Sequence, residues 1–483
     1  MMNIAEYAAL DATGLAALVQ KKQVAPKELA QTAAAAIAKG DKRLKSVVEL
    51  YPDRIEGLDE KRLGSGPFRG VPFLIKDVFG HEAGRVIEFG SRLCKGMKVE
   101  ASTAYVDGIK AAGFNILGRS AAPEYSMAAT TESVLYGNCS NPWKDGYSAG
   151  GSSGGAQAAV TAGLVPVAHG SDIGGSIRIP ASWCGGVGLK PSRGRVSLAP
   201  VVDEPGFGYS KNLVQARTVR DVAAILDWVS APQPGDPFVI PKPAEPYAQL
   251  ARQKPGKLRI GIVLDELAGV PVDPEVARAV EATGKVLSGM GHHVAQAKVE
   301  MGGLETLEAC RDLFFFGFDT RLDGYARRAG TRIGADTLEP VILSVYQHAK
   351  EITPVRFMKA LADLNVARRR LGAFYTSHDI WLSPTTARVA EPFGRYNLSK
   401  PGVDWNSLTD VLHRVPIQYT IPHNIMGTPA ISLPLAMHST GLPIGVQIAA
   451  RPADEHTVLQ LATALEDAMP WRDRVPPLHV SRQ

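Results

Sequence analysis

Residues 149–180 read AGGSSGGAQAAVTAGLVPVAHGSDIGGSIRIP and carry the strongest signal for the fold. Two glycine–serine segments, at 149–155 and 171–180, enclose an alanine-rich helix candidate and an apolar strand candidate at 162–172. The same order occurs upstream, where a helix predicted at 103–112 precedes the strand-like AAGFNILGR. Alternating helices and short buried strands favour an α/β sheet that is covered on both faces.

The remaining strand candidates extend this pattern along the chain. They are GVPFLIKDVFG at 70–80, LRIGIVLDE at 258–266, DIWLSPTTA at 379–387, AISLPLAMH at 430–438 and GLPIGVQIAAR at 441–451. The last two, joined by Ser-Thr-Gly, predict a hairpin, whereas 270–375 reads mostly as helix. We interpret the proline-rich stretch at 230–257 as a surface crossing within one domain, because strands return after it and need a sheet to join.

Composition argues against several classes of protein. Of the 483 residues, 45% are hydrophobic and 21% are charged, as in ordinary soluble globular proteins. The net charge of +5 comes without a Lys/Arg tract, which argues against a nucleic-acid partner. No stretch reaches the roughly 18 uninterrupted apolar residues of a membrane span, and the N-terminus lacks the basic and apolar regions of a signal peptide. We therefore expect a cytoplasmic protein with no membrane partner.

The spacing of the four cysteines does not indicate a redox motif or a metal site. Cys94, Cys139, Cys184 and Cys310 form no C-x-x-C pair, and no histidine cluster accompanies them at zinc-ligand spacing. We expect isolated reduced thiols, with Cys184 in the core, and neither a metal nor another cofactor.

Three familiar interpretations of the segment at 149–155 fit poorly. A Gly/Ser linker is usually longer, and this segment runs directly into a helix candidate. A P-loop needs a Gly-Lys-Ser/Thr sequence that is absent here. Gly150-x-Ser152-x-Gly154 matches the pattern of a nucleophile elbow, but the preceding SNPWKDGYS at 140–148 reads as a loop, whereas an elbow follows a buried strand.

A fourth interpretation includes Lys76, which ends the apolar run at 71–75. A lysine at a strand end commonly extends to water. Burial, however, disfavours the ammonium form and lowers the pKa, so that a lysine can serve as a general base near neutral pH. Because a serine hydroxyl is a weak nucleophile until a base removes its proton, a neutral Lys76 could act through one serine to activate another.

Three motifs together resemble the amidase signature family of serine hydrolases. They are PFLIKD at 72–77, GGSSGG at 150–155 and GSDIGGSIRIPASWCGGVGLKPSRGRVS at 170–197. Their order is that of the family, and so are the separations of 76 residues from Lys76 to Ser152 and of 24 from Ser152 to Ser176. The third motif is particularly similar to that of the branch that hydrolyses the cyclic dimer of nylon-6. Urethane-cleaving members of the family carry similar motifs.

The resemblance implies a role for each of the chemically active positions. Ser176 is expected to be the nucleophile, Ser152 the bridging serine and Lys76 the base. The oxyanion hole is expected at four backbone N–H groups, those of Ile173, Gly174, Gly175 and Ser176. Preorganised donors of this kind commonly contribute about 3–4 kcal/mol each to transition-state stabilisation.

The same resemblance implies supporting roles around these positions. The supporting residues are Gly151, Ser153, Asp172 and Arg178. The peptide bond between Gly151 and Ser152 is expected to be cis, Ser153 is expected to hold Ser152 in place, and the other two residues are expected to fix the nucleophile loop as an ion pair. Met127 lies where family members line the acyl pocket, although a lone methionine is as often a core residue.

For the whole chain, the resemblance implies one α/β domain over 1–483, with a twisted mixed sheet of about eleven strands flanked by helices. The catalytic core is expected at about 60–200, and the region at about 200–420 is expected to shape substrate access. The implied activity is hydrolysis of carboxamide, carbamate (urethane) or ester bonds in small or oligomeric substrates, through an acyl-enzyme and a Ser–cis-Ser–Lys triad. A homodimer is common in the family.

Two alternatives stay open at this point. Amidotransferase A-type subunits, which act on misacylated Glu-tRNA, carry Gln at the position of Ile179, so the sequence favours a free-standing amidase. A non-catalytic scaffold of the same fold is disfavoured because all three triad positions are intact. The exact substrate does not follow from the sequence.

Overall fold

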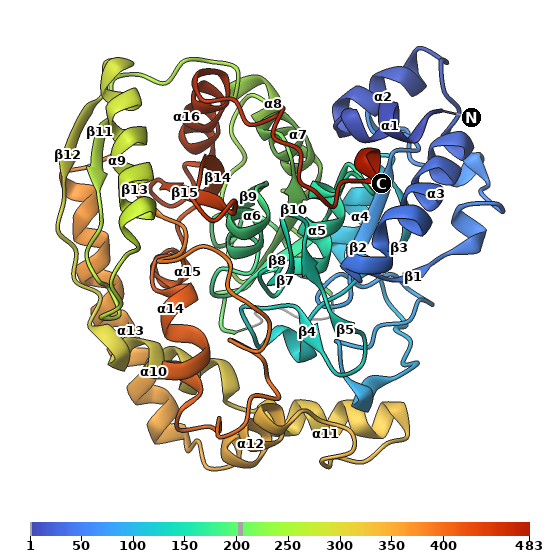
Figure 1. The fold of residues 1–483 in the computed structure, drawn as a ribbon. Helices are drawn as coiled ribbons and strands as arrows, with labels where there is room; N and C mark the ends of the chain where they lie inside the picture. The colour runs from blue at the N-terminus through green and yellow to red at the C-terminus, as the bar shows by residue number, and fades with distance from the viewer. Residues whose placement is uncertain (1, 201–205) are drawn as a thin grey trace.

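A single large sheet runs through the molecule. The computed structural model describes residues 2–200 and 206–483. The described strands form an 11-stranded mixed sheet, shown in Figure 1, with the order β1-β3-β2-β8-β10-β9-β14-β15-β13-β11-β12. These strands are β1 Val47–Leu50, β2 Pro72–Lys76, β3 Asn115–Ser120, β8 Val167–Asp172, β9 Val187–Lys190, β10 Lys211–Ala216, β11 Arg259–Ile262, β12 His293–Gln296, β13 Ile380–Pro384, β14 Ala430–Met437 and β15 Pro443–Ala449. The predicted α/β architecture is confirmed.

Helices cover this sheet along the whole chain. They are α1 Ile4–Ala9, α2 Ala12–Gln20, α3 Pro26–Leu44, α4 Ala104–Ala111, α5 Gly154–Thr161, α6 Arg178–Cys184, α7 Val219–Val229, α8 Tyr247–Leu250, α9 Pro274–Gly289, α10 Gly303–Phe315, α11 Phe318–Ala329, α12 Pro340–Ala349, α13 Pro354–Ala373, α14 Arg414–Ile417, α15 Ile421–Met426 and α16 Glu455–Ala468. The helix predicted at 103–112 is α4, and the hairpin predicted near the C-terminus is β14–β15, which pair antiparallel.

One local prediction was wrong. The segment 140–148, expected to be a loop, contains β6 (Ser140–Asn141) and β7 (Lys144–Ser148), which pair antiparallel in a separate two-stranded sheet. The turn forms because the side chain of Asn141 accepts a hydrogen bond from the N–H of Trp143 at 2.9 Å, as in an Asx turn. Since β7 lies outside the large sheet, the segment still does not supply the buried strand of a nucleophile elbow.

Strand direction determines which residues meet at the sheet edge. β2 runs parallel to β3 on one side and to β8 on the other, and Leu74 pairs with Ala168. The carboxyl ends of parallel strands lie at the same edge of a sheet, which is where ligands bind in open α/β folds. Lys76, the last residue of β2, therefore lies beside the end of β8 at Ser171 and Asp172.

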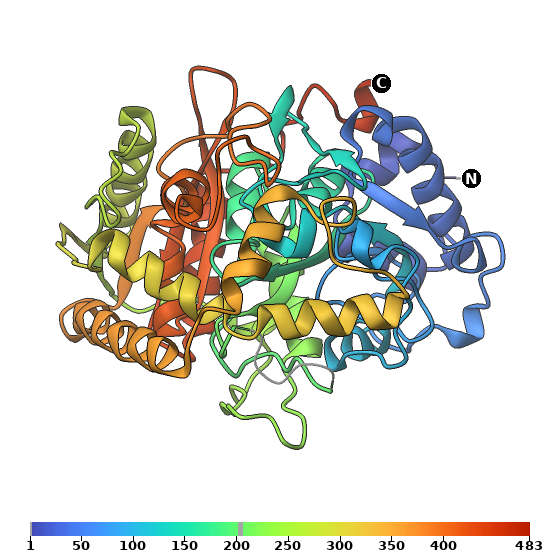
Figure 2. The same cartoon turned by 90° about the horizontal axis from the view of Figure 1, so that it is seen from below.

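The two faces of the sheet belong to different cores. On β13, Ile380 and Leu382 belong to one cluster with Val280 of α9, whereas Trp381 belongs to a second cluster with Leu364 of α13. This alternation follows from the twofold side-chain period of a strand. Helices α10–α13 lie at the lower end of the molecule in Figure 1 and face the viewer in Figure 2.

All four cysteines are buried and carry free thiols, in line with the expectation of isolated thiols. Among the helices of the described residues, none combines the length and the apolar character needed to cross a bilayer.

Candidate active site

Lys76 ends a strand in which every residue is buried, and its side chain is fully enclosed. Three serine hydroxyls surround its amine. Nζ lies 2.8 Å from Oγ of Ser152, 3.0 Å from Oγ of Ser153 and 2.8 Å from Oγ of Ser171. Burial lowers the pKa of Lys76 well below its usual value, and the charge of Asp172 opposes this shift only in part. Burial thus favours the neutral amine that the sequence suggested.

Ser152 and Ser153 lie on the loop that enters α5. The peptide bond between Gly151 and Ser152 is cis, as the resemblance implied. Only glycine fits before it, because a Cβ on Gly151 would lie 2.4 Å from the carbonyl oxygen of Thr130. Ser153 bridges to β8: its hydroxyl accepts from the N–H of Ser171 at 3.2 Å and donates to the carbonyl of the same residue at 3.3 Å.

Ser176 lies on the turn between β8 and α6. The N–H of Ser153 donates to its carbonyl oxygen at 3.3 Å, which ties the two serine loops together. The side chain of Ser176 is 9% exposed and lines a pocket that Lys76 does not reach. In the described part of the chain no hydrogen bond joins the hydroxyls of Ser152 and Ser176, so the structure brings the lysine–serine pair together and places the second serine on the adjacent loop.

The loop before Ser176 is held by a buried ion pair. Arg178 donates through Nε to Oδ2 of Asp172 and through Nη2 to Oδ1, both at 2.9 Å. Asp172 also accepts from the N–H of Gly175 at 2.8 Å and of Ile177 at 3.2 Å. Although burial alone would raise it, the Arg178 charge and hydrogen bonds bring the pKa of Asp172 down to about 2.

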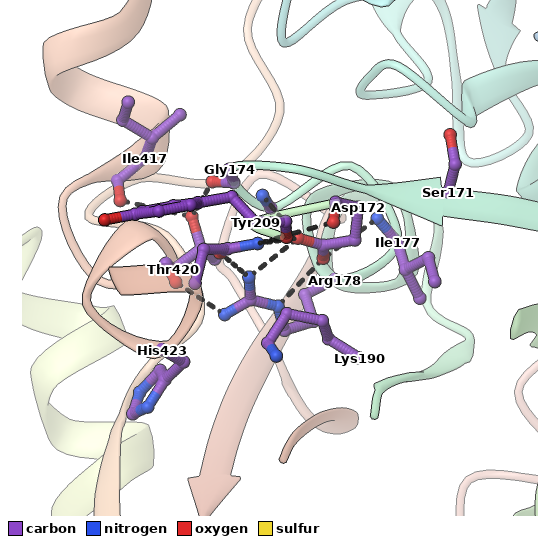
Figure 3. A network of polar contacts seen from close by, with 12 residues as sticks. Ser171, Asp172, Gly174, Ile177, Arg178, Lys190, Tyr209, Ile417, Thr420 and His423 are labelled. Carbon is purple, nitrogen blue, oxygen red and sulfur yellow. Dashed lines mark hydrogen bonds and ion pairs between the residues drawn. The ribbon is translucent and has the colours of Figure 1, made fainter. Parts of the chain in front are cut away.

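Arg178 extends this network to a distant part of the chain. Figure 3 shows its guanidinium between Asp172 and Thr420, with Lys190 beside it. Nη1 donates to the carbonyl of Thr420 and to Oε1 of Gln447, each at 2.8 Å. The hydroxyl of Thr420 donates in turn to the carbonyl of Gly174 at 2.6 Å. The nucleophile loop is therefore fixed from α6 and from the segment before α15.

The four candidate oxyanion donors differ in whether their N–H group already has a hydrogen-bond acceptor in the protein. The N–H of Gly175 is engaged by Asp172, as described above. Within residues 2–200 and 206–483, the N–H groups of Ile173, Gly174 and Ser176 donate to no protein acceptor. Gly175 has a φ of +136°, and a Cβ there would lie 2.4 Å from Oγ1 of Thr420, so this position requires glycine.

The pocket beside Ser176 is mostly apolar. Its walls come from two parts of the chain: one is the serine loops and the segment that includes Met127, and the other is α10 and the residues from 409 to 421. The lining residues are Ser126, Met127, Ala128, Ala129, Gly151, Ile173, Gly174, Ser176, Ile179, Leu307, Cys310, Arg311, Phe314, Phe315, Thr409, His413, Ile417 and Ile421. Met127 thus lies at the pocket rather than only in the core.

Sequence reasoning missed two parts of the site. Ser171 was not singled out, although its place at the end of a strand parallel to that of Lys76 could have suggested the contact. The walls from α10 and from 409–421 carried no motif, because their role depends on how distant segments pack.

Comparison with known proteins identifies the family of the chain. The family model described as Amidase matches residues 28–459. The chain therefore belongs to the amidase family, whose signature motifs it carries, and is an amidase-type hydrolase of carbon–nitrogen bonds.

Individual relatives cover nearly the whole chain. A 6-aminohexanoate-cyclic-dimer hydrolase of Paenarthrobacter ureafaciens is 36% identical over 481 residues, covering 97% of this chain and 96% of the relative. A solved structure of 6-aminohexanoate cyclic dimer hydrolase complexed with substrate superposes with a TM-score of 0.93 at 34% identity, covering 98% and 99% of the two chains. The A-type subunit of a glutamyl-tRNA(Gln) amidotransferase from Synechococcus is 30% identical, covering 95% and 97%.

Proposed function

We propose that the protein hydrolyses carboxamide or carbamate bonds through an acyl-enzyme on Ser176, with Lys76 as the base and Ser152 as the relay. The observation that carries this proposal is the 2.8 Å contact between Nζ of Lys76 and Oγ of Ser152 inside a fully buried site. A buried amine with a lowered pKa has a free lone pair, which is what a general base needs.

The hydrogen-bond inventory supports Ser152 as the relay. A neutral amine offers two N–H donors and one lone pair, so one of its three hydroxyl neighbours must donate to it. Ser153 uses its own proton toward the carbonyl of Ser171. The lone pair of Lys76 therefore accepts from Ser152 or from Ser171. Of these two, only Ser152 lies on the loop that also contains pocket-lining Gly151.

The proposed reaction has two halves. Lys76 takes the proton of Ser152 as Ser152 takes that of Ser176, and the Ser176 oxygen attacks the substrate carbonyl. The oxyanion is stabilised by the N–H groups of Ile173, Gly174 and Ser176, joined by Gly175 if its bond to Asp172 opens. The proton then returns through the same path to the leaving nitrogen, and water resolves the acyl-enzyme by the reverse sequence.

The pocket and the relatives support the proposed substrate class. The mostly apolar walls suit a small molecule or an oligomer with an aliphatic or aromatic acyl part. Aryl amides, aryl carbamates, esters and nylon-type oligomers all present the same carbonyl to Ser176. The region from 200 to 420 supplies much of the wall, in line with a role in substrate access.

A panel of substrates tests this proposal. Purified protein alone should hydrolyse an aryl amide and an aryl carbamate faster than a tripeptide, and the Ser176→Ala variant should lose this activity. A fluorophosphonate probe should label the wild type but not that variant. Turnover only with tRNA and added partner proteins would favour the amidotransferase role, and an unlabelled, inactive protein would favour a non-catalytic scaffold. Ile179 lines the pocket, and an isoleucine at this position favours the free-standing amidase over the amidotransferase subunit.

A further inference from the structure

His169 is a buried histidine that the proposed mechanism does not use. It lies within β8, shortly before Ser171, and its side chain is completely shielded from solvent. Its Nδ1 accepts a hydrogen bond from the backbone N–H of Lys76 at 3.3 Å. Within the described residues Nε2 has no partner at hydrogen-bond distance. The hydrogen bond of the ring therefore goes to the residue that carries the candidate base.

This bond stands where a bond between strands would be expected. Successive N–H groups of an extended strand point to opposite edges, and the N–H of Asp77 donates to the carbonyl of Ser120 in β3 at 3.2 Å. The N–H of Lys76 therefore faces β8. In the described structure, however, the register of β2 and β8 ends at Leu74 and Ala168. A buried N–H needs an acceptor, and the imidazole supplies it in place of a strand carbonyl.

A second side chain acts in the same way on β8. The hydroxyl of Ser153 bonds both the N–H and the carbonyl of Ser171, as described above. Side chains thus replace backbone pairing at the carboxyl ends of β2 and β8. The amine of Lys76 lies beside them, 3.0 Å from Oγ of Ser153 and 2.8 Å from Oγ of Ser171. The place of the Lys76 backbone therefore helps to set where Nζ lies among the hydroxyls.

Close neighbours hold the imidazole in place. A Cβ on Gly80 would lie 2.5 Å from Nδ1 of His169, so the chain that follows β2 passes directly against the ring. The centroid of the Tyr105 ring lies 4.7 Å from that of the imidazole, and the Tyr105 hydroxyl donates to the carbonyl of Leu213 at 2.6 Å. These contacts leave the ring little freedom to turn away from Lys76.

The ring is neutral, as a hydrogen-bond acceptor must be. Burial lowers the pKa of His169 to about 3, and nearby Lys76 and His81 act in the same direction. The side chain of Asn212 opposes this shift only in part. Tyr105 carries no charge, because burial raises its pKa well above the usual value. A neutral ring that accepts at Nδ1 carries its proton on Nε2.

We propose that His169 is a positioning residue for Lys76. Its ring accepts the backbone N–H that the strand register leaves without a carbonyl, and this bond fixes the amine at its distances from the serine hydroxyls. The inference rests on the proposed function, because it takes Lys76 as the base.

Steady-state kinetics on one aryl amide tests this proposal with two substitutions. His169→Asn keeps an acceptor close to the position of Nδ1, whereas His169→Leu removes it. We expect His169→Leu to lower kcat by about tenfold or more and to change KM less than about twofold, because a small displacement of a catalytic group costs rate rather than binding. His169→Asn should recover most of kcat. Full activity of His169→Leu, or equal losses in the two variants, would overturn the proposal.

His479 supplies a matched control. It is buried as well, and its Nδ1 accepts from the backbone N–H of Ser481, also at 3.3 Å. His479→Leu should keep kcat, and a loss as large as that of His169→Leu would indicate a general effect of removing a buried ring and would overturn the proposal. Should His169→Leu fail to fold, His169→Gln replaces it with the same expectation, because the Gln acceptor lies nearer the position of Nε2.

Amide hydrogen exchange in the segment 72–77 measures the bond without catalysis. The N–H of Lys76 should exchange faster in His169→Leu or His169→Gln than in the wild type, and His169→Asn should restore its protection. Unchanged exchange in the variants that lack the acceptor would overturn the proposal. If exchange responds as expected but Lys76→Met hydrolyses the amide at the wild-type rate, the proposed function is wrong and the anchoring of Lys76 by His169 stands.

Discussion

Nζ of Lys76 and Oγ of Ser152 lie 2.8 Å apart, and both side chains are almost completely shielded from solvent. The pair joins the end of a central strand to the loop that enters α5. A lysine so placed can accept a proton only in its neutral form, and burial favours that form by lowering the pKa of Lys76. The following predictions test the roles of the Lys76 amine, of its serine neighbours and of burial one at a time.

Removing the amine should abolish hydrolysis. We expect Lys76→Met to lower kcat/KM for an aryl amide by about 10³-fold or more, since general-base catalysis contributes about 10²–10⁴-fold. Lys190, also fully buried and with a lowered pKa, donates only to the carbonyl of Pro191 and contacts no serine hydroxyl in the described structure. Lys190→Met is therefore the matched control and should retain most of the activity. Equal losses in the two variants would point to a general effect of emptying a buried lysine site.

The hydroxyls of Ser152 and Ser171 both lie 2.8 Å from Nζ of Lys76. Comparing their variants therefore distinguishes transfer of a proton to Lys76 from positioning of its side chain. Ser152→Ala and Ser171→Ala each remove one hydrogen bond of equal length to the amine. If Ser152 also transfers the proton, its loss should lower kcat by about 10²-fold or more, whereas loss of Ser171 should cost about tenfold or less. Steady-state kinetics on one aryl amide suffices, and similar losses in both variants would contradict the relay role.

Activity should rise with pH and then level off. The base is the neutral form of Lys76, and burial lowers its pKa, so kcat/KM should increase through that lowered pKa and reach a plateau well below pH 10.5. Profiles of kcat/KM with a neutral substrate check this. A rise that continues to the pH of an ordinary lysine would show that the amine is not desolvated in solution.

The lowered pKa of Lys76 should also make the free energy of unfolding depend on pH. Folding lowers the pKa of Lys76, so between the lowered value and 10.5 the unfolded chain binds a proton that the folded chain lacks. Stability attributable to this position therefore rises with pH over that window. The difference in free energy of unfolding between Lys76→Met and the wild type should shift in favour of the wild type as pH increases from 7 to 10, as measured by urea titration.

Breaking the buried ion pair should destabilise the protein. Asp172→Asn leaves the guanidinium of Arg178 buried without its counter-charge, which commonly costs about 3–5 kcal/mol. Asp363 forms an exposed pair with Lys359 at 2.6 Å, and Asp363→Asn should cost less than about 1 kcal/mol. Urea unfolding at pH 7 distinguishes these outcomes, and a small cost at Asp172 would mean that the network relaxes around the lost charge.

Acid should erode the contribution of the same pair. Folding lowers the pKa of Asp172 to about 2 from 3.8, so its stabilisation is present above pH 3.8 and is lost as pH falls toward 2. A shift of this size corresponds to roughly 2–3 kcal/mol. The gap in stability between wild type and Asp172→Asn should therefore narrow below pH 4 in a denaturant series.

The sequence was most informative where chemistry and periodicity coincide. The apolar run before Lys76 indicated a buried strand, and burial of its last residue led directly to a lowered pKa. The glycine–serine segments indicated the loops of the site, and the structure shows that Gly151 and Gly175 leave no room for a Cβ. The hairpin at 140–148 was missed because its turn depends on one side-chain hydrogen bond from Trp143 to Asn141 rather than on glycine.

The pocket could not be predicted in the same way. Leu307, Phe314 and Ile417 look like ordinary core residues, and nothing local distinguishes an apolar residue that faces a ligand from one that faces another helix. The same holds for the hydroxyls of Ser126 and Thr409, which have no hydrogen-bond partner among the described residues. Ser171 lies between these two cases: the sequence alone did not indicate it, but once the strand order is known, its contact with Lys76 can be predicted.

The division of the site between two parts of the chain bears on protein engineering. Lys76 and its three serine neighbours lie on β2, on β8 and on the loop into α5, whereas Leu307, Cys310 and Phe314 line the pocket from α10. A mutant library confined to α10 and residues 409–421 would therefore change the pocket wall while leaving Lys76 and its serine neighbours untouched. Under the proposed mechanism, selection for a new substrate would then begin from an unchanged lysine–serine arrangement.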